Sequence, residues 1–415
     1  MIAREQLRSA TARFDSSALA ALAVVLILAL ATPTLSAQTY TVLYTFQGQS
    51  DGGFPNPGLY RDSSGNLYGI TTTAGNRSDC NNYGCGTVYK LTASGEFSVL
   101  HTFTGGVDGW PNATWGALIP DPTGNLYGVA SIGGAGDNGV VFRITPSGTF
   151  TVLHTFPSGR NDGLGPQYSL LRDPATGLLY GTTFGGGNLG LDGYGTVFVL
   201  TRTAIGSDMV LHSFDLGDGA YPQGDIAYDG VANLYGTTGS GGTSDCGVVW
   251  KMRNTGAYAV LYNFTCAPDG YLAGSVVLDA QGNIYGGTSE GGDASACPFY
   301  GCGIIFKISP SGQETILHTF HNTDGASPNE LMFDPQGNLW GTTAFGGTHD
   351  QGTIFKITTN GTFTDEYNFV GGMNGGVPYA GLVEDAEGNF YGTTGGGILR
   401  CIQSGCGMVY KFTPQ

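Results

Sequence analysis

Seven copies of one short unit fill the chain from about residue 40 to its last residue. A phrase of the type GNLYG begins at residues 65, 124, 177, 232, 282, 337 and 388. Each copy is followed by a second phrase of the type GTVYK. A third phrase, of the type VLHTF, ends seven times in Phe, at Phe46, Phe103, Phe156, Phe214, Phe264, Phe320 and Phe369. These Phe residues are 49 to 58 residues apart, so the chain must fold as an array of similar modules.

Each unit supplies four pieces of strand length. In the second unit they are the segment that ends at Asp121 and the segments that begin at 125, 139 and 149. The turn DPTGN joins the first two pieces and PSG joins the last two, and both are typical of tight hairpins. Four antiparallel strands per unit of about 50 residues, repeated many times, predict a β-propeller.

The composition agrees with an all-β chain. Of 415 residues 72 are Gly and 40% are hydrophobic, and no helical periodicity is sustained after residue 40. Glycine at this level without a strict three-residue period excludes collagen, and the apolar content excludes a disordered tract.

The last unit lacks its fourth strand, because the sequence stops at Gln415 after GMVYKFTP. The segment YTVLYTF at 40–46 is a fourth strand without a unit of its own. A ring of sheets must close, or it would leave two open edges. We therefore predict that residues 40–46 complete the seventh blade, and that 38–415 form one seven-bladed domain.

The first 37 residues differ from the rest. Three Arg residues precede the apolar run ALAALAVVLILALA at 18–31, and small residues follow at Ser36 and Ala37. This order is typical of a secretory signal peptide cut after Ala37. The alternative is an uncleaved anchor, but the run is shorter than the roughly 20 residues of a membrane span.

The remaining chain is strongly acidic. Removing three Arg, one Glu and one Asp with the first 37 residues leaves 13 basic and 30 acidic residues, a formal charge of −17. Such a charge repels nucleic acids and anionic membrane surfaces. It suits an exported protein, either extracellular or periplasmic, with no membrane span after cleavage.

The cysteines fall into pairs set by the repeat. Three pairs share one spacing and place, and in each the second Cys precedes the Gly that opens the third strand: Cys80 with Cys85, Cys297 with Cys302, and Cys401 with Cys406. Cys246 has the same second position without a mate, and its predicted partner is Cys266 after the fourth strand. We expect four disulfides, because export leads to an oxidising compartment. Metal binding by the C-x4-C loops is the alternative.

Long and variable loops follow the second and fourth strands, so both kinds lie on one face of the ring, which we call the long-loop face. Binding is expected there or at the mouth of the channel. The loop after the fourth strand repeats an Asp-Gly phrase, which supplies the carboxylates Asp51, Asp108, Asp162, Asp218, Asp269 and Asp324, with Phe54, Trp110, Tyr221 and Tyr271 beside them. They could bind Ca²⁺ or stack on sugar rings. The alternative, favoured by their repetition, is that Asp-Gly organises the turn and the aromatic side chains pack.

Catalytic residues are hard to find in this pattern. A second set of Asp residues precedes the tight turn of every unit and is expected to organise it: Asp62, Asp121, Asp173, Asp229, Asp279, Asp334 and Asp385. His101, His154, His212 and His318 share one outer-strand position with tyrosines, which indicates packing rather than proton transfer. No catalytic residue and no cofactor is predicted. Paired acids for glycoside cleavage stay open, since any two blades could bring them together.

The combination GNLYGTT, GG, GTVFK, SG and LH.F resembles the GloVer (Gloeo/Verruco) tandem repeat of bacterial proteins described as choice-of-anchor. The resemblance covers residues 40–415. It implies an exported propeller-like protein and brings no activity and no catalytic residues. Family members often end in an anchoring segment, and this chain is expected to be anchorless.

The function predicted from the sequence is a non-enzymatic binding scaffold, expected to be a monomer, for extracellular polysaccharide or a surface protein. The alternative is an extracellular carbohydrate-active enzyme, a hydrolase or lyase, with its site at the channel mouth. A purely structural envelope protein is the third hypothesis. An exposed acidic pair that departs from the repeat would favour the enzyme.

Overall fold

The computed structural model describes residues 38–55, 58–76, 78–157, 162–189, 192–200, 208–297, 301–395 and 406–415. Residues Tyr40–Thr413 form one compact unit, and a second unit comprises Met1–Thr39 with Pro414–Gln415. The predicted signal peptide, residues 1–37, lies outside the described residues.

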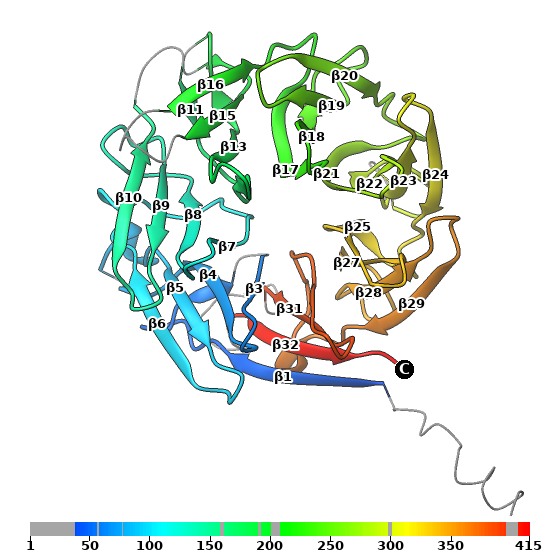
Figure 1. Cartoon of the computed structure of the whole chain (residues 1–415). Coiled ribbons are helices and arrows are strands. Elements are labelled where there is room, and N and C mark those ends of the chain that lie inside the picture. Colours follow the sequence, from blue (N-terminus) through cyan, green and yellow to red (C-terminus); the bar gives the residue numbers. More distant parts are fainter. Residues whose placement is uncertain are drawn as a thin grey trace, which may run out of the picture. The chain divides into compact units, whose positions relative to one another are not determined.

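The strands of the unit Tyr40–Thr413 form seven blades in a propeller arrangement, as predicted (Figure 1). In each blade the first strand is innermost and the fourth outermost. The first three blades contain β2 (Gly53–Pro55), β3 (Tyr60–Arg61), β4 (Leu67–Thr73), β5 (Thr87–Leu91) and β6 (Phe97–Thr102); β7 (Ile119–Pro120), β8 (Leu126–Ala130), β9 (Val140–Ile144) and β10 (Phe150–Thr155); and β12 (Leu171–Arg172), β13 (Leu179–Thr183), β15 (Thr196–Leu200) and β16 (Asp208–Ser213). A small sheet beside blade 3 pairs β11 (Gly163–Leu164) with β14 (Gly185–Gly186).

Blades 4 to 6 follow the same order. They contain β17 (Ala220–Tyr228), β18 (Asn233–Ser240), β19 (Val248–Arg253) and β20 (Tyr258–Asn263); β21 (Tyr271–Leu278), β22 (Ile284–Glu290), β23 (Ile304–Ile308) and β24 (Glu314–Thr319); and β25 (Ala326–Pro328), β26 (Met332–Phe333), β27 (Leu339–Phe345), β28 (Thr353–Ile357) and β29 (Phe363–Asn368). The 3-10 turns η1 (Cys80–Asn82) and η3 (Gly372–Asn374) lie in loops.

Blade 7 is built from both ends of the sequence, as predicted. Its strands are β30 (Val383–Glu384), β31 (Phe390–Thr394), β32 (Met408–Thr413) and β1 (Thr39–Thr45), in the sheet order β1-β32-β31-β30. The backbone N–H of Phe46 donates to the carbonyl of Gly407 over 3.0 Å, and the N–H of Cys406 donates back to Phe46. The outer strand taken from the N-terminal side therefore closes the ring.

The hydrophobic core is divided into seven clusters, each of which lies between two neighbouring blades. The Phe that ends an outer strand packs on the aromatic side chain of the third strand in the next blade, as Phe103 packs on Phe142 and Phe320 packs on Phe355. All seven of these Phe residues are buried, with exposed fractions of 0 to 4%. Each blade thus depends on both neighbours for its core.

The tight turns between first and second strands are organised by the predicted Asp residues. In blade 1, Asp62 Oδ1 accepts the backbone N–H groups of Ser64 and Asn66, both over 2.9 Å. The Asn66 amide donates to the other carboxylate oxygen of Asp62 over 2.7 Å. Equivalent bonds to backbone N–H groups recur in the other six blades, so this prediction is confirmed.

Candidate functional site

The innermost strands are interrupted where they line the channel. In blades 1 and 6 the inner strand is split in two, as β2 and β3, and as β25 and β26. In blades 4 and 5 the pairing register shifts between Gln223 and Ala227 and between Ala273 and Val276. Such bulges withdraw a residue from the ladder and redirect its groups. The residues there, four positions before each turn Asp, form what we call the channel belt: Gly58, Ala117, Ser169, Asp225, Ser275, Glu330 and Gly381.

A chain of hydrogen bonds runs along the belt from blade 2 to blade 6. The backbone N–H of Ala117 donates to Ser169 Oγ over 2.7 Å, and the N–H of Ser169 donates to Asp225 Oδ1 over 2.7 Å. The N–H of Asp225 donates to Ser275 Oγ over 2.9 Å. The Ser275 hydroxyl then donates to Glu330 Oε1 over 2.8 Å. Side chains of the next blade thus accept the backbone N–H groups of Ala117, Ser169 and Asp225.

The other belt positions are small, which brings their blades close together. A Cβ added to Gly58 would lie 2.3 Å from the Cβ of Ala117. A Cβ added to Gly381 would lie 2.8 Å from Glu330 Oε2. Glycine at position 381 therefore leaves room for the Glu330 carboxylate. The belt is tight and apolar in blades 1, 2 and 7, and polar in blades 3 to 6.

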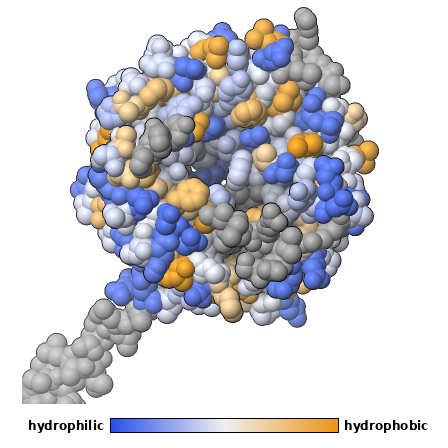
Figure 2. Space-filling model, turned by 180° about the vertical axis from the view of Figure 1, so that it is seen from behind, coloured by the Kyte–Doolittle hydropathy of each residue, from blue (hydrophilic) through white to orange (hydrophobic). Residues whose placement is uncertain are grey.

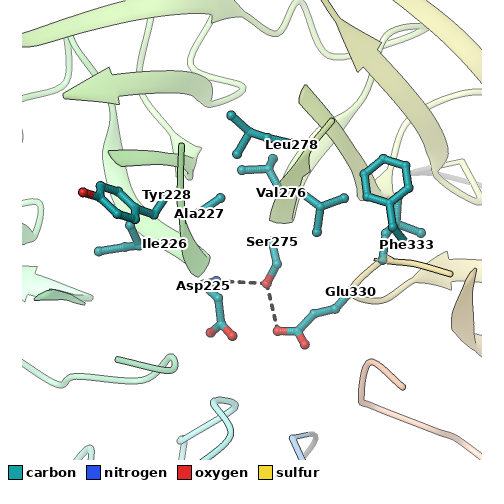
Figure 3. A pocket seen from close by; sticks show the side chains of 11 residues that line it. Asp225, Ile226, Ala227, Tyr228, Ser275, Val276, Leu278, Glu330 and Phe333 are labelled. Carbon is teal, nitrogen blue, oxygen red and sulfur yellow. Dashed lines mark hydrogen bonds between the residues drawn. The ribbon is translucent and has the colours of Figure 1, made fainter. Parts of the chain in front are cut away.

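Two carboxyl groups, Asp225 and Glu330, flank Ser275 and point toward the open middle of the ring (Figure 3). Both side chains are partly exposed, although protein atoms surround them closely. Burial raises the pKa of Asp225, against the lowering effect of hydrogen bonds from Ser169. Burial, followed by the negative charge of Asp225, raises the pKa of Glu330. Because the two groups disfavour each other's ionisation, the pair tends to hold a proton near neutral pH.

A pocket of about 420 Å³ adjoins this pair. Its polar side is formed by Asp225, Ser275 and Glu330, and its apolar wall includes Ile226 and Val276 (Figure 3). The lining residues belong to the halves of the inner strands that lead into the tight turns. The pocket therefore lies on the tight-turn side of the belt, away from the long-loop face.

An aromatic pair lies on the other side of the channel. Trp115 in blade 2 and Tyr379 in blade 7 stand two positions before the belt, and their ring centroids are 6.0 Å apart. Their side chains are 39% and 38% exposed. The hollow at the centre of the propeller is visible in Figure 2. The channel thus has acidic groups in blades 4 and 6 and exposed aromatic rings in blades 2 and 7.

The six predicted loop aspartates do not form an open crown of carboxylates. Each faces the His or Tyr of the preceding outer strand, and we call this contact the outer latch. The Tyr hydroxyl or His Nε2 lies 2.6 to 3.8 Å from the carboxylate in the pairs Tyr44–Asp51, His101–Asp108, His154–Asp162, His212–Asp218, Tyr262–Asp269 and His318–Asp324. The carboxylates are therefore turned toward the protein, which supports their role in the turns.

The latch of blade 1 shows how these groups work. Asp108 is 7% exposed, and it accepts bonds from His101 Nε2 over 3.0 Å and from the N–H and hydroxyl of Thr104. Burial would raise the pKa of Asp108, but the hydrogen bonds from His101 and Thr104 outweigh it and hold the pKa below its ordinary value. The His101 ring also stacks on Phe150 of blade 2, with centroids 3.9 Å apart.

We expect the substitution Asp108→Ala to destabilise the protein by about 1–3 kcal/mol at neutral pH, because it leaves buried donors without an acceptor. The lowered pKa means that this stability is present above the ordinary Asp pKa of 3.8 and is lost as the pH falls through the folded-state pKa. Urea unfolding at pH 7 and pH 3 measures both effects. The exposed Glu96→Ala is the control, and an equal loss for both variants at pH 7 would contradict the latch.

The predicted aromatic residues lie in different loops, and two of them, Phe54 and Trp110, share Thr72 as a hydrogen-bond partner. Phe54 is 37% exposed, and Trp110 donates its indole N–H to the carbonyl of Thr72 over 3.0 Å. Tyr221 stacks on Phe184 with centroids 4.8 Å apart. Tyr271 lines a second pocket, of about 370 Å³, on the long-loop face together with Asp245, Cys246, Cys266 and Glu290.

Three of the predicted disulfides are present. They join Cys80 to Cys85, Cys246 to Cys266 and Cys297 to Cys302. The fourth predicted pair involves Cys401, which lies outside the described residues. The cross-links tie the long loops to the start of the third strand and so brace the long-loop face.

Among the described residues, no group of three or more His, Cys, Asp or Glu side chains is arranged to hold a metal ion. Within the same ranges, no helix has the length and apolarity to cross a membrane.

The channel belt was missed by reasoning from the sequence. The signal was available, because aligning the seven inner strands on their turn Asp shows Gly, Ala, Ser, Asp, Ser, Glu and Gly at one position. The latch also has a sequence signal. The outer-strand His or Tyr precedes the loop Asp by six to eight residues in all six pairs.

Comparison with known proteins identifies the family to which the repeat belongs. The model of a family described as the Gloeobacter/Verrucomicrobia repeat matches residues 29–156, 77–300 and 294–415. No curated protein matches the chain in sequence.

Solved structures share the fold at low sequence identity. Two extracellular domains of proteins from B. thetaiotaomicron, described as two-component systems, are 13% and 12% identical, with TM-scores of 0.54 and 0.56. These alignments cover 91% and 90% of this chain but only 41% and 39% of those chains. A structure described as a gluconolactonase from Xanthomonas campestris is 15% identical over 77% of this chain and 90% of that one, with a TM-score of 0.44.

Proposed function

This chain belongs to the Gloeobacter/Verrucomicrobia repeat family. We propose that it is an exported binding scaffold whose ligand site is the central channel. The ligand is a polyhydroxylated molecule of the carbohydrate class. The observation that carries the proposal is the polar part of the channel belt, Ser169, Asp225, Ser275 and Glu330.

Comparison of the seven repeats distinguishes the residues that the fold requires from those that it does not require. Turn Asp residues, latch residues and buried Phe residues recur in most or all blades, so they serve the propeller itself. At the belt, blades 1, 2 and 7 have Gly or Ala, which shows that a small residue is sufficient there. Placing two poorly hydrated carboxyl groups at such a position has a cost in stability. A ligand that uses these groups gives a reason for them.

The chemistry of the channel fits sugar hydroxyl groups. Carboxyl and Ser oxygens accept hydrogen bonds, and a protonated carboxyl or a Ser hydroxyl also donates them. Exposed aromatic rings such as Trp115 and Tyr379 offer flat apolar faces to the C–H faces of a sugar ring. A surface protein is a poorer candidate for the partner, because a pocket of about 420 Å³ is too small for a protein interface.

The extracellular location is part of the proposal. Its support is the acidic charge, the disulfides and the signal-like residues 1–37. Disulfides persist in oxidising compartments.

The acid pair favours one second candidate, a carbohydrate-active enzyme. Two neighbouring carboxyl groups, of which one is protonated and the other ionised, are the groups that a glycosidase uses as acid and base. Product analysis distinguishes this candidate from a binding protein, because only an enzyme releases new reducing ends or unsaturated products.

The test is calorimetric titration of residues 38–415 with a panel of soluble oligosaccharides and polysaccharides. For a glycan that binds, we expect Asp225→Asn, Glu330→Gln and Trp115→Ala each to weaken Kd about tenfold or more, because each removes a direct contact. The matched controls are the exposed Glu387→Gln in a tight turn and Tyr83→Ala on the long-loop face.

Two outcomes would refute the channel site. One is a glycan whose affinity survives the channel substitutions and is lost in Tyr83→Ala, since this would move the site to the long-loop face. The other is the lack of any binding across the panel.

Glu330→Gln is expected to raise the melting temperature at pH 8, because it removes a charge that burial disfavours.

A further inference from the structure

The outer latches of blades 2 and 4 depart from the others at one point, because the next outer strand begins with an acidic residue, Asp208 or Glu314, in place of an aromatic one. At five blade interfaces the outer-strand His or Tyr stacks on an aromatic side chain of the next outer strand. The pairs are Tyr44–Phe97, His101–Phe150, His212–Tyr258, His318–Phe363 and Tyr367–Tyr40, with centroids 3.9 to 4.7 Å apart. Between blades 4 and 5 the position of this aromatic is occupied by Glu314, at the start of β24.

The Tyr262 hydroxyl consequently meets two carboxyl groups. Its oxygen lies 2.6 Å from Asp269 Oδ2 and 2.9 Å from Glu314 Oε2. Asp269 also accepts the N–H and hydroxyl of Thr265. A phenol has one hydrogen, so it can donate to only one of these carboxylates. The other must bring its own proton and donate to the phenol oxygen.

Glu314 is the group that carries this proton. Asp269 is already held as an acceptor by Thr265, whereas Glu314 Oε1 is buried without a hydrogen-bond partner. Burial, followed by the charge of Asp269, raises the pKa of Glu314 to about 7, against the lowering effect of the Tyr262 hydroxyl.

Other charged groups near this site point elsewhere. Lys307 of β23 lies over the ring of Tyr285, 5.3 Å from its centroid. His318 of β24 pairs with Asp324. The titratable groups that face Glu314 are therefore Tyr262 of β20 and Asp269 of the following loop.

We propose that Tyr262, Asp269 and Glu314 form a proton-dependent latch, which holds blades 4 and 5 together when Glu314 is protonated and weakens when it ionises. Ionisation places two negative carboxylates at one phenol oxygen with one hydrogen between them. This device is independent of the channel ligand. It acts at the outer edge of an interface whose inner edge contains the bond from Asp225 N–H to Ser275 Oγ.

The pKa of Glu314 is higher in the folded protein than in the unfolded chain, so protonation of Glu314 stabilises the folded protein. The contribution is complete below the ordinary Glu pKa of 4.5, declines as the pH rises, and is lost above about 7. The latch therefore stabilises the protein more in acidic than in alkaline surroundings.

The test compares melting temperatures of the wild type and of Glu314→Gln from pH 5 to pH 9. The Gln amide can donate to the phenol at every pH, so we expect the difference between the two proteins to grow between pH 5 and pH 8 in favour of the variant. The channel acids titrate in both proteins and cancel in the difference. Glu96→Gln, next to the equivalent strand of blade 1, is the matched control, and its profile is expected to follow the wild type.

A second variant keeps the test decisive if Glu314→Gln folds poorly. Glu314→Phe introduces the aromatic stack found at five other interfaces, and the variant is expected to melt above the wild type at pH 8 with less dependence on pH. Tyr262→Phe removes the shared hydroxyl group and is expected to alter the same part of the profile. A constant offset between wild type and Glu314 variants from pH 5 to pH 9 would overturn the proposal.

Discussion

Removing residues 38–47 is expected to lower the melting temperature by about 10 °C or more and to promote aggregation. The deletion takes away β1 and Phe46, which is fully buried between blades 7 and 1 with Tyr89 and Val409. Loss of a buried Phe alone costs about 3–5 kcal/mol, and each kcal/mol corresponds to roughly 2–4 °C in domains of about 150–250 residues. The exposed edge of β32 can then pair with other molecules.

A circular permutant is the control for this deletion. It moves residues 38–47 behind residue 415 through a short Gly-containing turn, like the turns between the third and fourth strands of the other blades. We expect its melting temperature, measured by calorimetry, to return close to that of the intact chain. If the deleted protein melted like the intact one, the closure of the ring by β1 would be contradicted.

Phe320→Ala is expected to destabilise the protein by about 3–5 kcal/mol, because it removes a buried ring and opens a cavity between two blades. Phe320 is fully buried between blades 5 and 6. Its ring centroid lies 5.4 Å from that of Phe355 and 5.7 Å from that of Phe363. Urea unfolding measures the loss.

The control for this substitution is Ile316→Ala on the same strand, where the side chain is 37% exposed. We expect a loss of less than about 1 kcal/mol, as is usual for surface positions. Comparable losses for Phe320→Ala and Ile316→Ala would show that the inter-blade clusters do not dominate the stability of this propeller.

The two kinds of acidic group have opposite consequences for stability. The turn aspartates and the latch residues Asp108 and Asp324 accept several hydrogen bonds, which hold their pKa values below the ordinary value, so their contribution to stability is lost in acid. Glu314 and Glu330 are short of donors and poorly hydrated, so their pKa values are raised. We therefore attribute the structural role to the repeated acids and a ligand or proton role to the unrepeated ones.

Much of the fold could be predicted from the sequence because each structural role recurs with the unit. The seven Phe residues mark the seven buried cluster positions. Asp62 and its equivalents mark the tight turns, and Cys80 and Cys85 mark a disulfide that spans a single loop. Such features depend on neighbours in sequence or on the fixed register of a hairpin, which short-range chemistry determines.

The site could not be predicted in the same way. Asp225 and Glu330 are 105 residues apart in sequence, and they approach each other only because the ring brings blades 4, 5 and 6 around one channel. No single inner strand shows that its belt residue will meet a side chain of the next blade. Likewise, Tyr262 and Glu314 meet across a blade interface, and the carboxyl group replaces an aromatic ring whose place is evident only once the blades are packed.

The repeated unit was enough to predict the number of blades, the order of their strands and the closing strand, because all of these follow from one period repeated seven times. The packing of the blades determines the role of each carboxylate. Some accept hydrogen bonds in the turns and latches, whereas others lie at the channel wall or share a proton. The physical reason is that the roles of these carboxyl groups depend on hydrogen-bond donors and burial supplied by other blades, and the closed ring alone brings those blades together.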